Sequence, residues 1–136
     1  MKRVGFIGLG NMGLPMASNI LKAGIEINAF DLSVDAMLKA EELGMKTKNT
    51  TSEVLENIDA LITMLPSDMA VENIFLKENL LGQINKDIIV IESSTISPQV
   101  AKKVSKEAAK MDIAMLDAPV SGGVKGAELG TLTFIV

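Results

Sequence analysis

The 136-residue sequence contains no histidine, cysteine, tryptophan or tyrosine. The absence of cysteine excludes disulfides and cysteine nucleophiles, and the absence of histidine excludes histidine-ligated metals and a Ser-His-Asp triad. Two designs for hydride transfer are excluded as well, because one needs a histidine and the other a Tyr-Lys pair as the acid/base. A chain without cysteine suits a reducing compartment. We therefore expect no metal site, and chemistry that rests on other residue types.

Positive charge and long apolar runs are also scarce. The formal net charge is −4 at pH 7, which argues against a general affinity for nucleic acid or acidic membranes. No apolar run approaches the roughly 18 residues of a membrane span. The apolar start of the chain is interrupted by Gly5, Gly8 and Gly10, and no cleavage site follows it. The sequence predicts a cytoplasmic protein with a small-molecule ligand, no nucleic-acid partner and no membrane partner.

Short apolar segments rich in β-branched residues alternate with helical patterns along the whole chain. Several of the apolar segments contain no polar residue, as is required of strands that are covered on both faces. This alternation predicts an α/β fold of the Rossmann type, with a doubly wound, mainly parallel sheet and helices on both faces. The expected strands are residues 4–7, 25–30, 60–65, 88–91, 114–116 and 132–136, and the expected helices are 12–23, 33–43, a short one from 50, and 97–111.

A G-x-G-x-x-G string, Gly8-Leu9-Gly10-Asn11-Met12-Gly13, directly follows the first expected strand and opens an amphipathic helix. This context distinguishes a dinucleotide-binding turn from a chance cluster of glycines. Gly8 is expected to permit a tight turn, Gly10 to let the backbone approach a pyrophosphate, and Gly13 to let helix and strand pack closely. The helix N-terminus then offers free N–H groups to the phosphates. All six residues of the string, including Leu9, Asn11 and Met12, are therefore candidate cofactor contacts. The alternative is a purely structural turn.

Asp31 stands at the end of the second expected strand. A carboxylate at this position can accept hydrogen bonds from the hydroxyls of an adenosine ribose and would repel a 2′-phosphate, and no arginine lies beside it. Asp31 therefore predicts NAD as the cofactor, with NADP as the less favoured alternative. Without a ligand, Asp31 would be a solvated strand end.

Two further expected strand ends lie where an open parallel sheet binds its ligands. Leu65 and Pro66 end the strand 60–65 and are candidates to line the nucleotide pocket. Thr95 follows the strand 88–91, and its hydroxyl is a candidate contact on the nicotinamide side. The residues alone leave the alternatives open, in which Pro66 starts a loop and Thr95 belongs to a segment that caps the next helix.

The segment 117–130 has four glycines within nine residues, next to Ser121. Successive free N–H groups in a glycine-rich turn can bind a carboxylate, and the Ser121 hydroxyl can add a hydrogen bond. The alternative is a flexible surface loop, which Pro119 and the flanking apolar strands make less attractive. We expect a turn that binds the carboxylate of a substrate.

Together these motifs resemble the β-hydroxyacid dehydrogenase family, in which an NAD(P)-linked enzyme interconverts a 3-hydroxy acid and its semialdehyde. The resemblance rests on residues 4–13, 62–66, 93–96 and 117–123 and covers essentially the whole chain. One departure is Glu92, where the family usually has aspartate. The resemblance implies cofactor contacts at Gly8, Gly10, Gly13, Asp31, Leu65, Pro66 and Thr95, and substrate contacts at Ser121, Gly122 and Gly123.

The resemblance also implies parts that this chain lacks. The family's catalytic lysine lies on a long helix of an all-helical second domain, beyond Val136, and Lys125 is better interpreted as a solvated lysine than as its substitute. We therefore expect residues 1–136 to be a dinucleotide-binding domain that is truncated within its last strands and inactive alone, while the full-length enzyme forms a homo-oligomer. The motifs fit 3-hydroxyisobutyrate or tartronate semialdehyde as substrate. A nucleotide-binding module without turnover is the alternative of another class.

Overall fold

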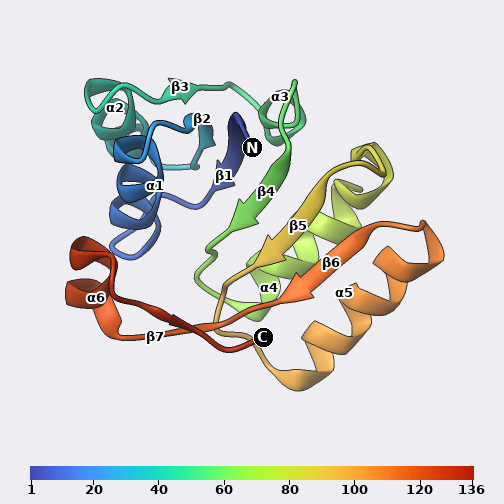
Figure 1. Ribbon diagram of the computed structural model, residues 1–136. Helices are drawn as coiled ribbons and strands as arrows, with labels where there is room; N and C mark the ends of the chain where they lie inside the picture. Colours follow the sequence, from blue (N-terminus) through green and yellow to red (C-terminus); the bar gives the residue numbers. More distant parts are fainter.

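The computed structural model describes all 136 residues and has three layers (Figure 1). The middle layer is a six-stranded sheet in the order β3-β2-β1-β4-β5-β6, in which every neighbouring pair is parallel. This strand order is that of doubly wound nucleotide-binding folds, so the predicted Rossmann-type class is confirmed. The strands are β1 (Arg3–Ile7), β2 (Glu26–Phe30), β3 (Lys46–Thr47), β4 (Ala60–Thr63), β5 (Ile89–Glu92) and β6 (Ala114–Asp117).

Helices cover both faces of the sheet, and each face has its own hydrophobic core. On one face pack α1 (Gly13–Lys22), α2 (Val34–Glu42) and α6 (Gly123–Leu129). On the other face pack α3 (Thr51–Val54), α4 (Asp68–Glu72), the π-helical turn η1 (Asn73–Lys77), the 3₁₀ turn η2 (Leu81–Gln83) and α5 (Pro98–Lys110). No helix of the structure is long and apolar enough to cross a membrane.

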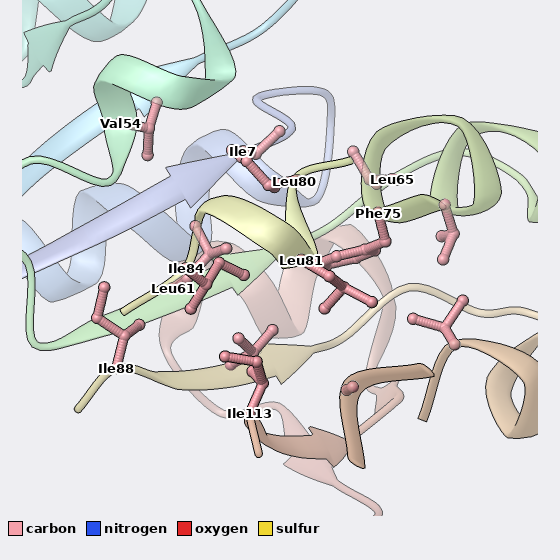
Figure 2. Packing of buried hydrophobic residues seen from close by; sticks show 14 of the residues in the cluster. Ile7, Val54, Leu61, Leu65, Phe75, Leu80, Leu81, Ile84, Ile88 and Ile113 are labelled. Atoms are coloured by element: carbon pink, nitrogen blue, oxygen red, sulfur yellow. The ribbon is translucent and has the colours of Figure 1, made fainter. Parts of the chain in front are cut away.

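The apolar sequence of β1 explains how one strand serves both cores. Successive side chains of a strand point to opposite faces of the sheet, so Val4 and Phe6 join the core under α1 while Ile7 joins the core on the α5 side. Figure 2 shows Ile7 and Phe75 within this second core, where Phe75 is completely buried. A strand buried on both faces needs apolar residues at every position, as the sequence indicated.

The helix caps follow the predicted chemistry. The hydroxyl oxygens of Ser33, Thr50 and Ser97 accept hydrogen bonds from backbone N–H groups in the first turns of α2, α3 and α5. Each of these residues stands immediately before its helix, where such a bond satisfies an N–H group that has no partner within the helix. The three helix starts therefore lie where the sequence placed them.

The predicted strand bounds agree with the structure to within two residues, but the last predicted strand does not join the main sheet. The strand expected at 132–136 is only β8 (Thr133–Phe134), which pairs antiparallel with β7 (Val120–Ser121) in a separate two-stranded ribbon. The reason is that α6 connects β7 to β8 and reverses the direction of the chain, so that β8 lies beside β7. Six short elements were not predicted: β3, α4, its continuation η1, η2, β7 and α6.

The glycine-rich segment 117–130 is also more regular than predicted, because its second half is the helix α6. Ala127 is buried in the core that α1 also lines, and the Asn19 side-chain amide of α1 donates to the Ala127 carbonyl at 2.6 Å, while the buried Gly126 faces Leu132 in the segment after α6. Small residues allow α6 to pack closely on α1. Packing between helices thus overrides the low helix propensity of glycine.

Candidate functional site

The turn between β1 and α1 requires glycine at two positions. Gly8 has a φ of +102°, and a Cβ atom there would lie 2.1 Å from the Met64 carbonyl oxygen. A Cβ atom at Gly13 would lie 1.8 Å from the Gly8 carbonyl oxygen. Both contacts involve backbone atoms, so no side-chain movement relieves them. Gly8 and Gly13 therefore have the tight-turn and close-packing geometry that the motif predicts.

Gly10 differs from these two glycines, because it is exposed and a Cβ atom there would have no neighbour within 4 Å. After Gly10, the first N–H group that donates to a backbone carbonyl of the turn is that of Leu14, whose acceptor is the Gly10 carbonyl oxygen at 3.1 Å. The N–H groups of Asn11 and Met12 have no hydrogen-bond partner in the chain. Open space beside free N–H groups at the start of a helix is the arrangement that accepts a phosphate.

The carboxylate of Asp31 connects the glycine turn to the start of α2. One oxygen accepts a hydrogen bond from the Leu9 N–H at 2.7 Å, and the other accepts from the Ser33 N–H at 2.7 Å. A carboxylate has about four acceptor positions, so the two bonds leave capacity for ribose hydroxyls. Asp31 thus brings a negative charge to the turn and also helps to hold the turn in place.

A hollow of about 500 Å³ opens in front of the turn, within the size range of small-molecule and cofactor sites. Leu65 lines the hollow from the end of β4, with its side chain continuing into the core shown in Figure 2. Eight predicted cofactor residues line it: Gly8, Gly10, Asn11, Met12, Gly13, Asp31, Leu65 and Pro66. Most of the predicted cofactor contacts therefore meet at one place.

Five predicted residues lie outside the lining of this hollow. Leu9 is buried, and its N–H is already bonded to Asp31, so Leu9 supports the turn from behind. Thr95 is exposed after β5. Ser121 is exposed at the end of β7, in the separate β7–β8 ribbon, and Gly122 and Gly123 are exposed at the start of α6. The substrate residues therefore stand apart from the hollow in this chain.

Sequence reasoning missed the apolar wall that α4 and η1 supply. Ala70 and Ile74 line the hollow from these helices, and Leu32 lines it from the loop after β2. The Ser67 hydroxyl oxygen accepts from the Ala70 N–H at 3.1 Å, as a helix cap does. The Ser67-Asp68 pair was thus a readable signal for a helix at this point.

A buried polar network lies behind the hollow, at the ends of β4 and β5. Glu92 is 1% exposed, and its carboxylate accepts hydrogen bonds from the Thr63 hydroxyl and from the Ser94 N–H. Burial raises the pKa of the Glu92 carboxyl above its ordinary value, the bonds from Ser94 and Thr63 oppose this rise, and the nearby charge of Asp117 adds to it. Glu92 is therefore a carboxyl whose ionisation folding disfavours.

This raised pKa predicts a pH-dependent stability difference. Because the folded-state pKa of Glu92 lies above its unfolded value, its stabilising contribution is full below the unfolded pKa and is lost as pH rises through the folded pKa. Glu92→Gln removes the titrating group. We therefore expect the Tm of the variant relative to that of the wild type to rise between about pH 4 and about pH 7. Thermal unfolding followed by circular dichroism measures it, with exposed Glu41→Gln as the control. A difference that stays constant with pH would contradict the prediction.

Comparison with known proteins supports the nucleotide-binding interpretation. Residues 3–136 match the family described as the NAD binding domain of 6-phosphogluconate dehydrogenase. A 3-hydroxyisobutyrate dehydrogenase of Pseudomonas aeruginosa is 44% identical, over 100% of this chain and 46% of that protein. An NAD-dependent L-serine dehydrogenase of the same organism is also 44% identical, with 100% and 46% coverage. The structure of Mycobacterium tuberculosis 3-hydroxyisobutyrate dehydrogenase with L-serine has a TM-score of 0.93 and 38% identity, covering 98% of this chain and 45% of that one.

The parallel sheet, the glycine turn and the acidic residue after β2 define a dinucleotide-binding domain of the Rossmann type. The chain belongs to the family of NAD-binding domains that includes that of 6-phosphogluconate dehydrogenase. The predicted resemblance to β-hydroxyacid dehydrogenases and the predicted cofactor, NAD, are confirmed at this level. The chain spans less than half the length of the relatives described above.

Proposed function

We propose that this chain is the cofactor-binding half of an NAD-dependent oxidoreductase that interconverts a 3-hydroxy acid and its semialdehyde, with 3-hydroxyisobutyrate as the acid. The observation that carries the proposal is the glycine turn, joined through the Leu9 N–H to Asp31 in front of the hollow. Two relatives named 3-hydroxyisobutyrate dehydrogenase support the choice of substrate. The predicted cytoplasmic location and homo-oligomeric assembly of the whole protein stay predictions.

Each predicted contact has a defined task in this proposal. NAD supplies the hydride acceptor when it is bound. The open backbone at Gly10 receives the pyrophosphate, and Asp31 accepts hydrogen bonds from the adenosine ribose. Leu65 and Pro66 exclude water from one side of the dinucleotide, and Thr95 contacts its nicotinamide half.

The substrate side is built from the start of α6. The N–H groups of Gly122 and Gly123 and the hydroxyl of Ser121 hold the substrate carboxylate, which orients the hydroxyl-bearing carbon toward the nicotinamide. A lysine outside this chain accepts the hydroxyl proton, because a desolvated lysine beside a positive charge has a lowered pKa. On this proposal the 136-residue chain binds the cofactor without turning over substrate.

L-serine is a second candidate substrate, since it is a 3-hydroxy acid and a relative 44% identical is named for its oxidation. Tartronate semialdehyde, the alternative that the motifs left open, presents the same carboxylate. Rates of NAD reduction by the full-length protein with 3-hydroxyisobutyrate and L-serine, and of NADH oxidation with tartronate semialdehyde, separate the three. A full-length protein that binds NADH and turns over none of them would favour a nucleotide-binding module.

The first experiment is a titration of the chain with NADH, followed by nicotinamide fluorescence. The sequence has no Trp or Tyr, which leaves the fluorescence background low. We expect saturable binding that NADPH displaces poorly, because Asp31 repels a 2′-phosphate. Equal displacement by NADPH would overturn the NAD preference alone, whereas no NADH binding would overturn the proposed function.

Asp31→Asn provides a second prediction for this site. An amide has only one acceptor oxygen, so it loses one of the bonds to the Leu9 and Ser33 N–H groups and also the bonds expected from the ribose. We expect NADH affinity to fall about tenfold, and the preference over NADPH to shrink. Competition titrations measure both effects, with the remote, exposed Asp87→Asn as control. Unchanged NADH affinity in Asp31→Asn would contradict the assignment.

A further inference from the structure

We propose that Glu92 is a positioning residue that fixes the Leu65–Pro66 wall of the cofactor site relative to Thr95 and to the segment before Ser121. The inference rests on the proposed function, because it concerns the geometry of the same site. Glu92 itself is buried and does not line the hollow. Its effect on the cofactor is therefore exerted through the loops that it connects.

The first connection runs from Glu92 to Leu65. The Ser94 N–H donates to a Glu92 carboxylate oxygen at 2.7 Å, and the Leu65 N–H donates to the Ser94 hydroxyl oxygen at 2.7 Å. The Leu65 bond joins the loop after β4 to the loop after β5, across positions 29 apart in the sequence. Because Ser94 precedes Thr95 directly, the same network sets the starting point of the loop that carries Thr95.

The second connection passes through the Thr63 hydroxyl at the end of β4. Thr63 is completely buried and donates to the Glu92 carboxylate. Met64 and Leu65 leave the sheet immediately after this residue. Glu92 therefore holds the last residue of β4 with one carboxylate oxygen and Ser94 with the other.

The third connection uses the backbone of Glu92. The Ala118 N–H donates to the Glu92 carbonyl oxygen at 2.8 Å, and Ala118 is 1% exposed. Ala118 begins the segment that leads through Pro119 to Ser121. One residue thus joins the three chain segments that carry the Leu65–Pro66 wall, the predicted nicotinamide contact Thr95 and the predicted substrate contact Ser121, although it lies outside the lining of the hollow.

Hydrogen-bond geometry, more than charge, performs this role. A glutamine at position 92 keeps one oxygen for the Ser94 N–H, and its amide donates to the Thr63 hydroxyl, which accepts as readily as it donates. A methionine has similar length and neither function. Ser94→Ala removes the acceptor of the Leu65 N–H while Glu92 remains. These substitutions distinguish the effect of losing the hydrogen-bond network from the effect of changing the side-chain volume.

The test measures two ligands with the 136-residue chain. NADH affinity is followed by fluorescence, and ADP, which lacks the nicotinamide riboside, by calorimetry. We expect Glu92→Met to weaken NADH binding about tenfold, Ser94→Ala to weaken it similarly, and the double variant to add little further. ADP affinity should stay within about twofold in each. Glu92→Gln should retain most of the NADH affinity, and Glu41→Met, on the exposed face of α2, controls for the substitution itself.

Several outcomes decide the inference. A folded Glu92→Met variant with unchanged NADH affinity would overturn it. Equal losses of affinity for NADH and for ADP would also overturn it, because they would indicate a general loss of structure. If Glu92→Met does not fold, Ser94→Ala gives the same comparison. Amide hydrogen exchange of Leu65 is a readout independent of NADH, and we expect it to be faster in Glu92→Met and Ser94→Ala. A wild-type chain that bound no NADH would overturn the proposed function, whereas unchanged Leu65 exchange would overturn the positioning role.

Discussion

A chain with alanine in place of Gly13 is expected to lose much of its folding stability and all measurable NADH binding. The new Cβ atom would lie 1.8 Å from the Gly8 carbonyl oxygen and 3.3 Å from the Phe6 ring. Because the oxygen belongs to the backbone of the turn, α1 must move away from β1. We expect a loss of about 3 kcal/mol or more, the range of severe overpacking. Urea unfolding followed by circular dichroism measures it.

Gly10→Ala is the matched control, since it adds the same methyl group three residues earlier. No atom lies within 4 Å of a Cβ at Gly10, so we expect the free energy of unfolding to change by less than about 1 kcal/mol. NADH affinity should nevertheless fall at least about tenfold, because the methyl group occupies the space proposed for the pyrophosphate. Equal stability losses in Gly10→Ala and Gly13→Ala would contradict the distinction between the two glycines.

Phe75→Ala is expected to have the second large effect. Phe75 is completely buried within η1 and belongs to the core on the α5 side (Figure 2). Truncation of a buried phenylalanine costs about 3–5 kcal/mol through lost burial and the cavity left behind. Its neighbour Ile74 lines the cofactor hollow, so NADH affinity should fall together with stability.

The control for Phe75→Ala lies six residues earlier, on α4. Met69 is 71% exposed, and Met69→Ala should change the free energy of unfolding by less than about 0.5 kcal/mol and leave NADH binding intact. Thermal and urea unfolding of both variants, with an NADH titration of each folded protein, give the comparison. A stable Phe75→Ala variant would mean that η1 repacks around the cavity.

The parts of the fold that the sequence could predict are those with a strong local signal. β1 has an apolar run, the turn after it has three spaced glycines, and Ser97-Pro98 gives α5 a cap and a first-turn proline. Asp31 could be assigned to the cofactor site because the same motif predicts an acidic residue at the end of the second strand. These features depend on neighbours in sequence, so a single sequence contains them.

The parts that could not be predicted depend on contacts between distant residues. β3 is two residues long and exists because it pairs with β2. α6 contains glycines that favour a turn, and burial of Ala127 in the core beside α1 and of Gly126 beside Leu132 makes it a helix. Glu92 lies in an ordinary strand sequence, and its partner Thr63 is 29 positions away. No local pattern connects two such positions.

The strand order has a consequence for how a ribosome-bound chain can assemble this domain. β1 emerges first and becomes an inner strand, β2 pairs with one edge of it and β3 with the edge of β2. β4 then pairs with the other edge of β1, followed by β5 and β6 on the same side. Each newly made strand therefore finds an open edge, and none has to be inserted between two strands that are already paired. The sheet can grow in the order of synthesis, and each added strand covers an edge that would otherwise be free to associate with another nascent chain.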